Sequence, residues 1–223
     1  MGRKEGERMT NIRIELPTDY RRVEEITRKA FWNLYTPGAN EHYLVHTMRN
    51  HQDYIPELSF VIEENDEIIG SIHFTHAKVV TPVGEEIPVV HFGPVCITPE
   101  LHRQGFGRAL ITHAIEKARK SGHRAIVLGG FPYHYEPYGF TGTKKYNITM
   151  EDGKFYTGMM ALPLYEGALE GISGMLKLSD ALSPDESGLD AYDATFPPME
   201  KQVLPCQEAF EQAASEIDGQ EYT

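Results

Sequence analysis

The chain has 223 residues and carries 21 Lys and Arg against 33 Asp and Glu, a net charge of −12. A chain this acidic repels a phosphate backbone, which excludes nucleic acid as a general partner. No apolar run approaches the roughly 18 residues of a membrane span, so no membrane partner is expected. The two cysteines lie far apart and the N-terminus lacks an apolar stretch, which predicts a cytoplasmic protein with reduced thiols.

The negative charge is confined to the last third of the chain. Residues 1–150 hold 18 basic and 18 acidic side chains, whereas residues 151–223 hold three lysines and 15 acids. This asymmetry indicates two regions with different surroundings or roles.

The first part of the chain predicts one strand and two helices. Residues 1–10 are polar and are expected to form a flexible leader. Apolar and polar side chains alternate over 11–16, which is typical of a strand. Apolar residues at helical spacing predict helices over 19–32 and 41–50.

The middle of the chain predicts a sheet. Residues 60–64 and 68–76 form a hairpin pattern around a short turn. The nearly continuous apolar run 87–97 predicts a central strand. Pro94 lies inside it and cannot donate to the ladder, so we expect a bulge or a break in the pairing there.

The strongest helical pattern covers 105–121, with a buried strand at 125–128 and a short helix or turn at 133–138. Later strands are predicted at 146–150, 155–162 and 172–178, and helices at 189–195 and 205–217. This order predicts an α/β fold with a mixed (α+β) sheet rather than a doubly wound one.

A glycine-containing loop opens the strongest helix. It reads His102-Arg103-Gln104-Gly105-Phe106-Gly107 and follows the strand that ends at Ile97. Glycines let successive amides point at one place, and the helix N-terminus adds partial positive charge. Residues 103–124 also carry a local net charge of +5, so the segment predicts an anion site.

Two glycines alone do not say which anion binds. The dinucleotide fingerprint needs a third glycine, and the P-loop needs a Gly-Lys-Ser/Thr ending that is absent here. The pair Gly105 and Gly107 is equally compatible with a tight strand–helix connection.

The surrounding sequence narrows the choice. The loop resembles the pyrophosphate loop of GCN5-related N-acetyltransferases (GNAT), Gln/Arg-x-x-Gly-x-Gly/Ala, with His102 departing from its first position. FGPVCITPE resembles that family's fourth strand, and the segment 133–140 resembles its Tyr-x-x-x-Gly-Phe element. The resemblance, to an uncharacterised bacterial branch of predicted N-acetyltransferases, covers 11–162 and leaves 163–223 as an acidic C-terminal extension.

The resemblance implies that acetyl-CoA lies where strands 87–97 and 125–128 splay apart. Its pantetheine would pair with the first strand and its pyrophosphate would lie on the loop amides. The implied binding residues are Val95, Cys96, Ile97, Arg103, Gln104, Gly105, Phe106, Gly107 and Arg108. The Asn that many members carry before the tyrosine element is absent, since residues 129–132 read Gly-Gly-Phe-Pro.

The implied reaction is direct acetyl transfer to an amine in a ternary complex, with no metal. Tyr135 matches the family's tyrosine acid, although it could be a packing aromatic. The base is less clear. His91 is the first candidate because it is expected to share a strand face with Val95 and Ile97, although a core histidine explains it as well. His73, Glu63, Glu64 or a water chain are the alternatives.

Other interpretations stay open. The chain could be a non-catalytic acyl-CoA-binding or regulatory module of the same fold, or a dinucleotide enzyme. His42 and His46 have the i, i+4 spacing of metal ligands, but no third ligand type is near, so a solvated helix face is favoured. Cys96 is expected to be a small buried hydrophobe.

The acidic extension has three possible roles. It could shape an acceptor pocket for cationic amines, form a solvated edge, or serve as an element of a homodimer. The solvated or structural role is favoured by composition alone. The acceptor, a small molecule or another amine, is not readable from the sequence.

Overall fold

The computed structural model describes residues 9–221. The predicted leader therefore lies largely outside the described residues, and Thr10 already belongs to the first strand. The strands are β1 (Thr10–Ile14), β2 (Phe60–Glu64), β3 (Glu67–Val80), β4 (Glu86–Ile97), β5 (Ala125–Gly129), β6 (Thr141–Gly142), β7 (Ile148–Thr149), β8 (Met159–Pro163) and β9 (Gly174–Lys177). The helices are α1 (Tyr20–Phe31), α2 (Glu41–Met48), α3 (Phe106–Lys120), α4 (Pro132–Tyr135), α5 (Leu189–Asp193) and α6 (Pro205–Ser215).

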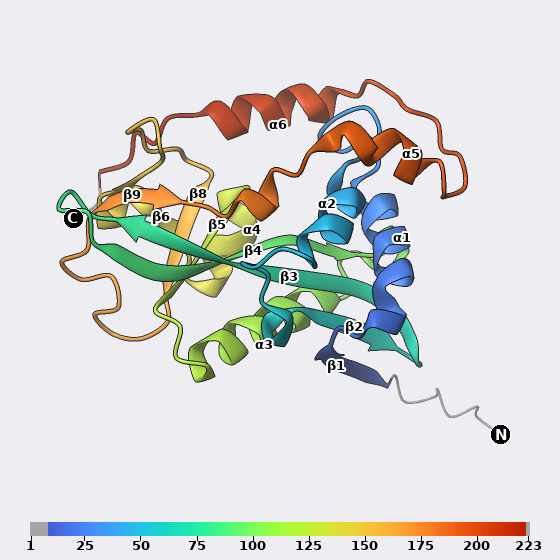
Figure 1. Ribbon diagram of the computed structural model, residues 1–223, viewed down its shortest axis with the longest axis horizontal. Helices are drawn as coiled ribbons and strands as arrows, with labels where there is room; N and C mark the ends of the chain where they lie inside the picture. Colours follow the sequence, from blue (N-terminus) through green and yellow to red (C-terminus); the bar gives the residue numbers. More distant parts are fainter. Residues whose placement is uncertain (1–8, 222–223) are drawn as a thin grey trace.

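The strands form one twisted mixed sheet in the order β1-β2-β3-β4-β5-β8-β6, with β9 pairing both β3 and β7 (Figure 1). The β4–β5 and β7–β9 pairs are parallel, and the other pairs are antiparallel. The predicted mixed sheet is confirmed.

Two predicted strands are shorter than expected. The segment 146–150 contributes only β7, because residues 143–146 form a 3-10 turn. The segment 155–162 becomes a strand only at Met159. The two-residue β6 beside β8 was not expected, since so short a strand leaves no periodic pattern.

Helices cover both faces of the sheet. α3 packs on one face through its apolar stripe, with Leu110 and Ala114 fully buried against Phe60 and Phe74. α1 and α2 cover the other face in a separate cluster that includes Val23. The amphipathic pattern of each helix therefore determines which sheet face it covers.

A bulge interrupts β4 at the predicted place. Ile72 faces Val95 and Phe74 faces Phe92, so two residues of β4, Gly93 and Pro94, oppose one residue of β3. The extra residue reverses the alternation of side chains. Phe92, Val95 and Ile97 all belong to the cluster on the α3 face. His91, next to Phe92, points to the opposite face, so its expected shared face with Val95 and Ile97 is wrong.

The acidic extension is part of the folded body. β9 joins the sheet, and α5 packs beside α1 and α2 (Figure 1). The segment before α6 is bound to Asn33, whose Oδ1 accepts from Gln202 N at 3.0 Å and whose Nδ2 donates to Glu200 O at 3.0 Å. Beyond α6, Ile217 forms a β-bridge with Tyr156. The boundary at residue 162 stays a prediction.

Within the described range, no helix combines the length and the apolar character needed to cross a membrane.

Candidate active site

A gap opens between the two central parallel strands. β4 pairs with β5 only at Val90–Ile126 and His91–Val127, although both strands continue further. Thr98 N donates to Ile69 O at 2.7 Å on the β3 side, so strand alternation turns the peptide groups of Val95 and Ile97 toward the gap. An extended chain could add to β4 here.

The start of α3 closes the end of this gap. Gly105 has φ +93°, a conformation that favours glycine, and Ala109 N donates the first helical bond to Gly105 O at 3.0 Å. The amides of the first turn therefore point out of the helix end. Phe106 anchors the turn in the core, whereas Arg103, Gln104 and Arg108 are exposed.

His102, the position that departs from the family pattern, contacts another part of the protein. Its Nε2 is 2.8 Å from Ile97 O, which ties the loop to the end of β4. Gly107 also lies on that strand end, since a Cβ placed there would be 3.7 Å from Ile97 Cγ1. The strand end and the anion loop therefore form one unit, and the residues present fit an acyl-CoA.

Tyr135 lies across the gap, on α4 just after β5. Its ring centroid is 5.8 Å from that of Phe92 and 6.0 Å from that of Phe140. The ring rests on Gly130, where a Cβ would come within 2.6 Å of Cε2. Burial, with Tyr35 and Tyr138 nearby, raises the pKa of Tyr135, so the phenol keeps its proton at neutral pH.

Comparison of the chain with known proteins identifies a family. A model of the acetyltransferase (GNAT) family matches residues 28–135, from within α1 to the end of α4. Residues 28–135 therefore form a domain of the GNAT family of acetyltransferases. The resemblance read from the glycine loop and the tyrosine element is therefore confirmed.

The relatives are distant. The uncharacterised N-acetyltransferase YhbS of Escherichia coli K12 is 24% identical over 167 residues, 74% of this chain and 94% of YhbS. Its crystal structure in complex with CoA has a TM-score of 0.71 at 20% identity and covers 82% of this chain and 97% of that one. A Brucella melitensis GNAT acetyltransferase in complex with acetyl-CoA has a TM-score of 0.63 at 23% identity, covering 78% and 97%. At these identities the structures show the fold.

The two histidines considered as bases in this GNAT fold are both buried. His91 is 9% exposed and His73 is fully buried. Burial lowers the pKa of each to about 4, so both imidazoles are neutral at pH 7. His73 has two polar neighbours, since Tyr54 Oη lies 3.5 Å and Glu15 Oε2 lies 4.0 Å from its Nδ1.

The two carboxylates considered as bases lie away from the gap. Glu63 and Glu64 are on β2, two strands from β4 in the sheet order. Glu63 is paired with Arg13, 2.6 Å from Oε1 to Nη2. Cys96 is 6% exposed, with its thiol 3.6 Å from Thr27 Oγ1, as expected for a buried small side chain.

Glu41, at the start of α2, is a candidate that the sequence did not reveal. Burial, with Glu186 nearby, raises the pKa of Glu41 to about 7, despite the Asn40 amide at 3.2 Å. Burial and the charge of Glu41 raise the pKa of Tyr35 to about 12. Tyr35 in turn contributes to the raised pKa of Tyr135. A proton acceptor with a pKa near 7 is suited to base catalysis.

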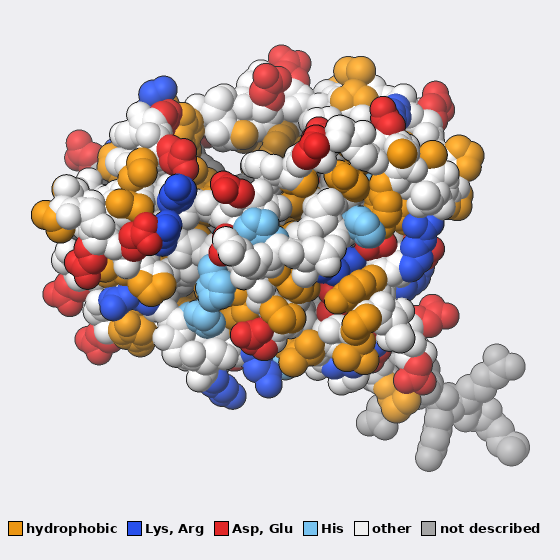
Figure 2. Space-filling model, in the orientation of Figure 1, with side chains coloured by type: hydrophobic (Ala, Val, Ile, Leu, Met, Phe, Trp, Pro, Cys, Tyr) orange, Lys and Arg blue, Asp and Glu red, His pale blue; other side chains and the backbone are white. Residues whose placement is uncertain are grey.

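A groove of about 1140 Å³ runs between α6 and the loop after α1. Aromatic rings of Tyr35, Tyr156 and Phe210 line it, together with the carboxylates of Glu208 and Glu211. Figure 2 shows acidic side chains over α6 and a hollow in the surface below it. Composition alone could not show that the extension borders the site.

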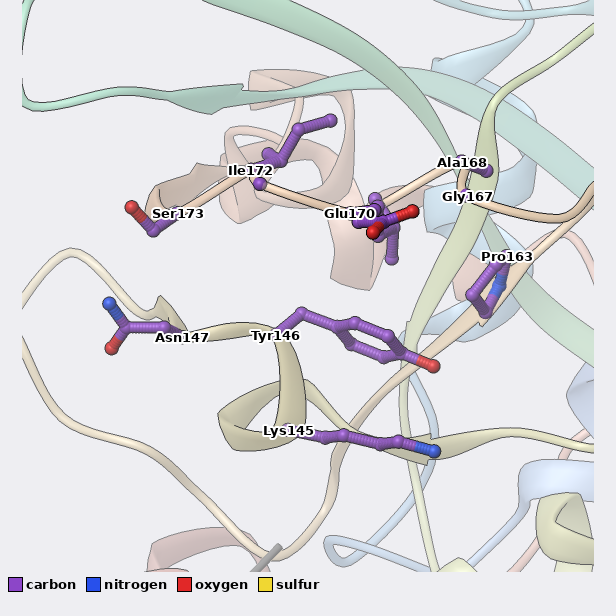
Figure 3. A pocket seen from close by; sticks show the side chains of 11 residues that line it. Lys145, Tyr146, Asn147, Pro163, Gly167, Ala168, Glu170, Ile172 and Ser173 are labelled. Carbon is purple, nitrogen blue, oxygen red and sulfur yellow. The ribbon is translucent and has the colours of Figure 1, made fainter. Parts of the chain in front are cut away.

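A second hollow, of about 510 Å³, lies elsewhere. Figure 3 shows Lys145, Tyr146 and Glu170 around it, with Pro163 at its edge. Pro163 pairs with Ala125 at the start of β5, whereas Tyr135 follows the other end of that strand. This hollow is therefore separate from the candidate active site.

The predicted solvated face of α2 is wrong for His42. His42 is fully buried beneath α5, with Nε2 3.1 Å from Asp193 Oδ1, whereas His46 Nδ1 is 3.1 Å from Glu24 Oε1. Each histidine thus has its own acidic neighbour. Among residues 9–221, no three His, Cys, Asp or Glu side chains are grouped to hold a metal.

Proposed function

We propose that the chain transfers the acetyl group of acetyl-CoA directly to an amine bound beside it. The observation that carries the proposal is the gap between β4 and β5, which ends at the first turn of α3. The CoA and acetyl-CoA bound in the two solved relatives support the same co-substrate.

The end of β4 and the loop before α3 would bind different parts of acetyl-CoA. The peptide groups of Val95 and the N–H of Ile97, whose carbonyl oxygen lies 2.8 Å from His102 Nε2, would bind the pantetheine amides as an added strand does. The first-turn amides of α3 would bind the pyrophosphate, and the charges of Arg103 and Arg108 would favour it. Acetyl-CoA supplies a thioester whose carbonyl carbon is open to attack by an amine.

On the acid–base side, two protons must move. The amine nitrogen bonds to the acetyl carbon, the carbon–sulfur bond breaks, the amine loses a proton and the sulfur gains one. Tyr135 is the proposed donor to the sulfur, since its phenol is protonated and its ring packs against Phe92 of β4. Glu41 is the proposed proton acceptor, with His91 as the alternative.

Glu41 is preferred to His91 on chemical grounds. A base with a pKa near 7 accepts a proton far more readily at neutral pH than one with a pKa near 4.

The experiment is an acetyl-transfer assay on a broad amine panel, following free CoA release, with CoA affinity measured in parallel. Tyr135→Phe should lower kcat by about 10²-fold or more with little change in CoA affinity. Tyr138→Phe, a half-buried phenol on the same segment, is the control and should retain activity.

The pH dependence separates the two candidate bases. In wild type, the rate should rise with an inflection near pH 7, and Glu41→Gln should abolish the inflection, whereas His91→Gln should leave it. If the wild-type protein binds acetyl-CoA but acetylates no amine in the panel, a non-catalytic acyl-CoA-binding module is the better description.

A further inference from the structure

We infer that the groove beneath α6 binds the acceptor, and that the acceptor is a cationic amine carried on an aromatic or alkyl body. The inference rests on the proposed acetyl transfer and adds the chemical class of its second substrate. It commits the acidic extension to one of the three roles that its composition left open.

The walls of the groove suit an apolar body. Tyr35 and Phe210 stack with their ring centroids 3.9 Å apart, and Tyr156 lines the groove as well. Aliphatic side chains also line the groove at Val203 and Leu204. Flat aromatic walls bind aromatic or alkyl groups through contact area, and they also attract cations through their faces.

The charges around the groove suit a cation. Glu208 and Glu211 belong to its lining and are exposed, and the described residues that line it include no lysine or arginine. The surrounding segment strengthens the field, since residues 180–223 hold 11 acids and Lys201 as their one basic side chain. A low-dielectric groove with acidic borders concentrates cationic ligands.

The groove leads toward the reacting groups. Phe210 lies 6.1 Å from Phe131, the residue that precedes α4 and hence Tyr135. A Cβ at Gly158 would lie 3.2 Å from Gly130 O and 3.9 Å from Ala213 O, so α6 also lies near Gly130, on which the ring of Tyr135 rests. An amine whose body lies along α6 would therefore reach the segment that carries Tyr135.

The wall made by α6 is fixed at both ends. In the first turn of the helix, Gln207 Nε2 donates to Asn33 O at 3.1 Å. After it, Thr157 N donates to Glu216 O at 2.9 Å. The groove is therefore a formed site rather than a chance space under a loose helix.

The test is calorimetric titration of the CoA-saturated protein with tryptamine and with its uncharged isostere tryptophol, at two salt concentrations. Tryptamine should bind about tenfold tighter, and the difference should shrink at high salt. Equal binding of the two probes would overturn the charge part of the inference, and no binding of either would overturn all of it.

Variants assign the binding to the groove. The pair Glu208→Gln with Glu211→Gln should weaken tryptamine binding about fivefold. The pair Glu166→Gln with Glu200→Gln removes the same charge outside the groove lining and should change little. Loss of affinity in both pairs would mean that only the net charge matters, which contradicts a specific site.

A bulky residue gives a readout that does not depend on charge. Ala214→Trp should fill the groove and abolish tryptamine binding, whereas Ala209→Trp, exposed on α6 outside the lining, should not. These assays measure binding alone. Binding without acetyl transfer would refute the proposed function and retain the site, and transfer that both tryptophan variants leave intact would do the reverse.

Discussion

The ring of Tyr35 lies against the ring of Phe210, with 3.9 Å between their centroids and an angle of 25° between their planes. This stack joins the loop between α1 and α2 to a helix about 175 residues further along the chain. Phe210 is also 6.1 Å from Phe131, ring centroid to ring centroid, so the stack lies beside the segment that carries the candidate acid Tyr135.

Phe210→Ala should release α6 without unfolding the core. A stacked aromatic pair contributes about 0.5–1.5 kcal/mol beyond its buried area, and the side chain is one of the few by which α6 faces the body. Limited proteolysis should therefore cut residues 200–216 faster in this variant. Gln212→Ala, an exposed change on the same helix, is the control and should be cut at the wild-type rate.

Glu41→Gln should be more stable than wild type at high pH. Burial disfavours the ionised carboxylate, so the native state binds more protons than the unfolded state between about pH 4.5 and pH 7. Wild-type stability therefore falls across that window, and the amide variant should not share the fall. Urea unfolding at pH 5 and pH 8 measures the difference.

Glu85→Gln, an exposed carboxylate in the β3–β4 hairpin, is the control for this measurement. It should follow the wild-type pH dependence. A Glu41→Gln protein that loses stability in parallel with wild type from pH 5 to pH 8 would show that Glu41 ionises freely, and the proposed base would be untenable.

Gly107→Ala should separate ligand binding from folding. A Cβ at Gly107 would meet Ile97 Cγ1 at 3.7 Å, an ordinary contact, so the stability should change by less than about 1 kcal/mol. If a pyrophosphate lies on these amides, the methyl group should still lower CoA affinity. Gly105→Ala, at φ +93°, should in addition lower the free energy of unfolding by about 1–2 kcal/mol. Unchanged CoA affinity in Gly107→Ala would place the phosphates elsewhere.

Arg49→Met should destabilise the fold by about 3–5 kcal/mol. Arg49 is buried between two carboxylates, with Nη2 2.7 Å from Glu15 Oε1 and Nη1 2.5 Å from Glu24 Oε1. Removing the guanidinium leaves both acids buried without their cation. Arg22→Met, 3.8 Å from Glu25 on an exposed helix face, should change the unfolding free energy by less than about 0.5 kcal/mol.

Much of the fold could be predicted because its elements carry strong local patterns. The apolar stripe of α3, the hairpin pattern of β2 and β3 and the proline in β4 each produced the expected structure. The short strand β6 could not be located, since two residues held by pairing alone have no period.

The site was predicted in part, for a physical reason. The glycine loop and Tyr135 depend on neighbours in sequence, and their signal is local. The electrostatic state of Glu41 depends on Glu186 and on the packing of a distant segment, so an acid in the first turn of a helix looked ordinary. The bulge of β4 was predicted, but its effect on the direction of His91 was not. The prediction assumed that side chains alternate without interruption from His91 to Ile97, and the bulge reverses that alternation.

The pairing of β9 with β3 has a consequence for any shortened form of this protein. β9 covers Lys78, Val79 and Val80, so a chain ending at residue 162 would present that stretch of β3 as an open edge. Uncovered edges of this kind recruit other strands. By covering this edge, the acidic third is expected to limit self-association of the core. A fragment trimmed to the family-like region should therefore precipitate under conditions in which the full chain stays in solution.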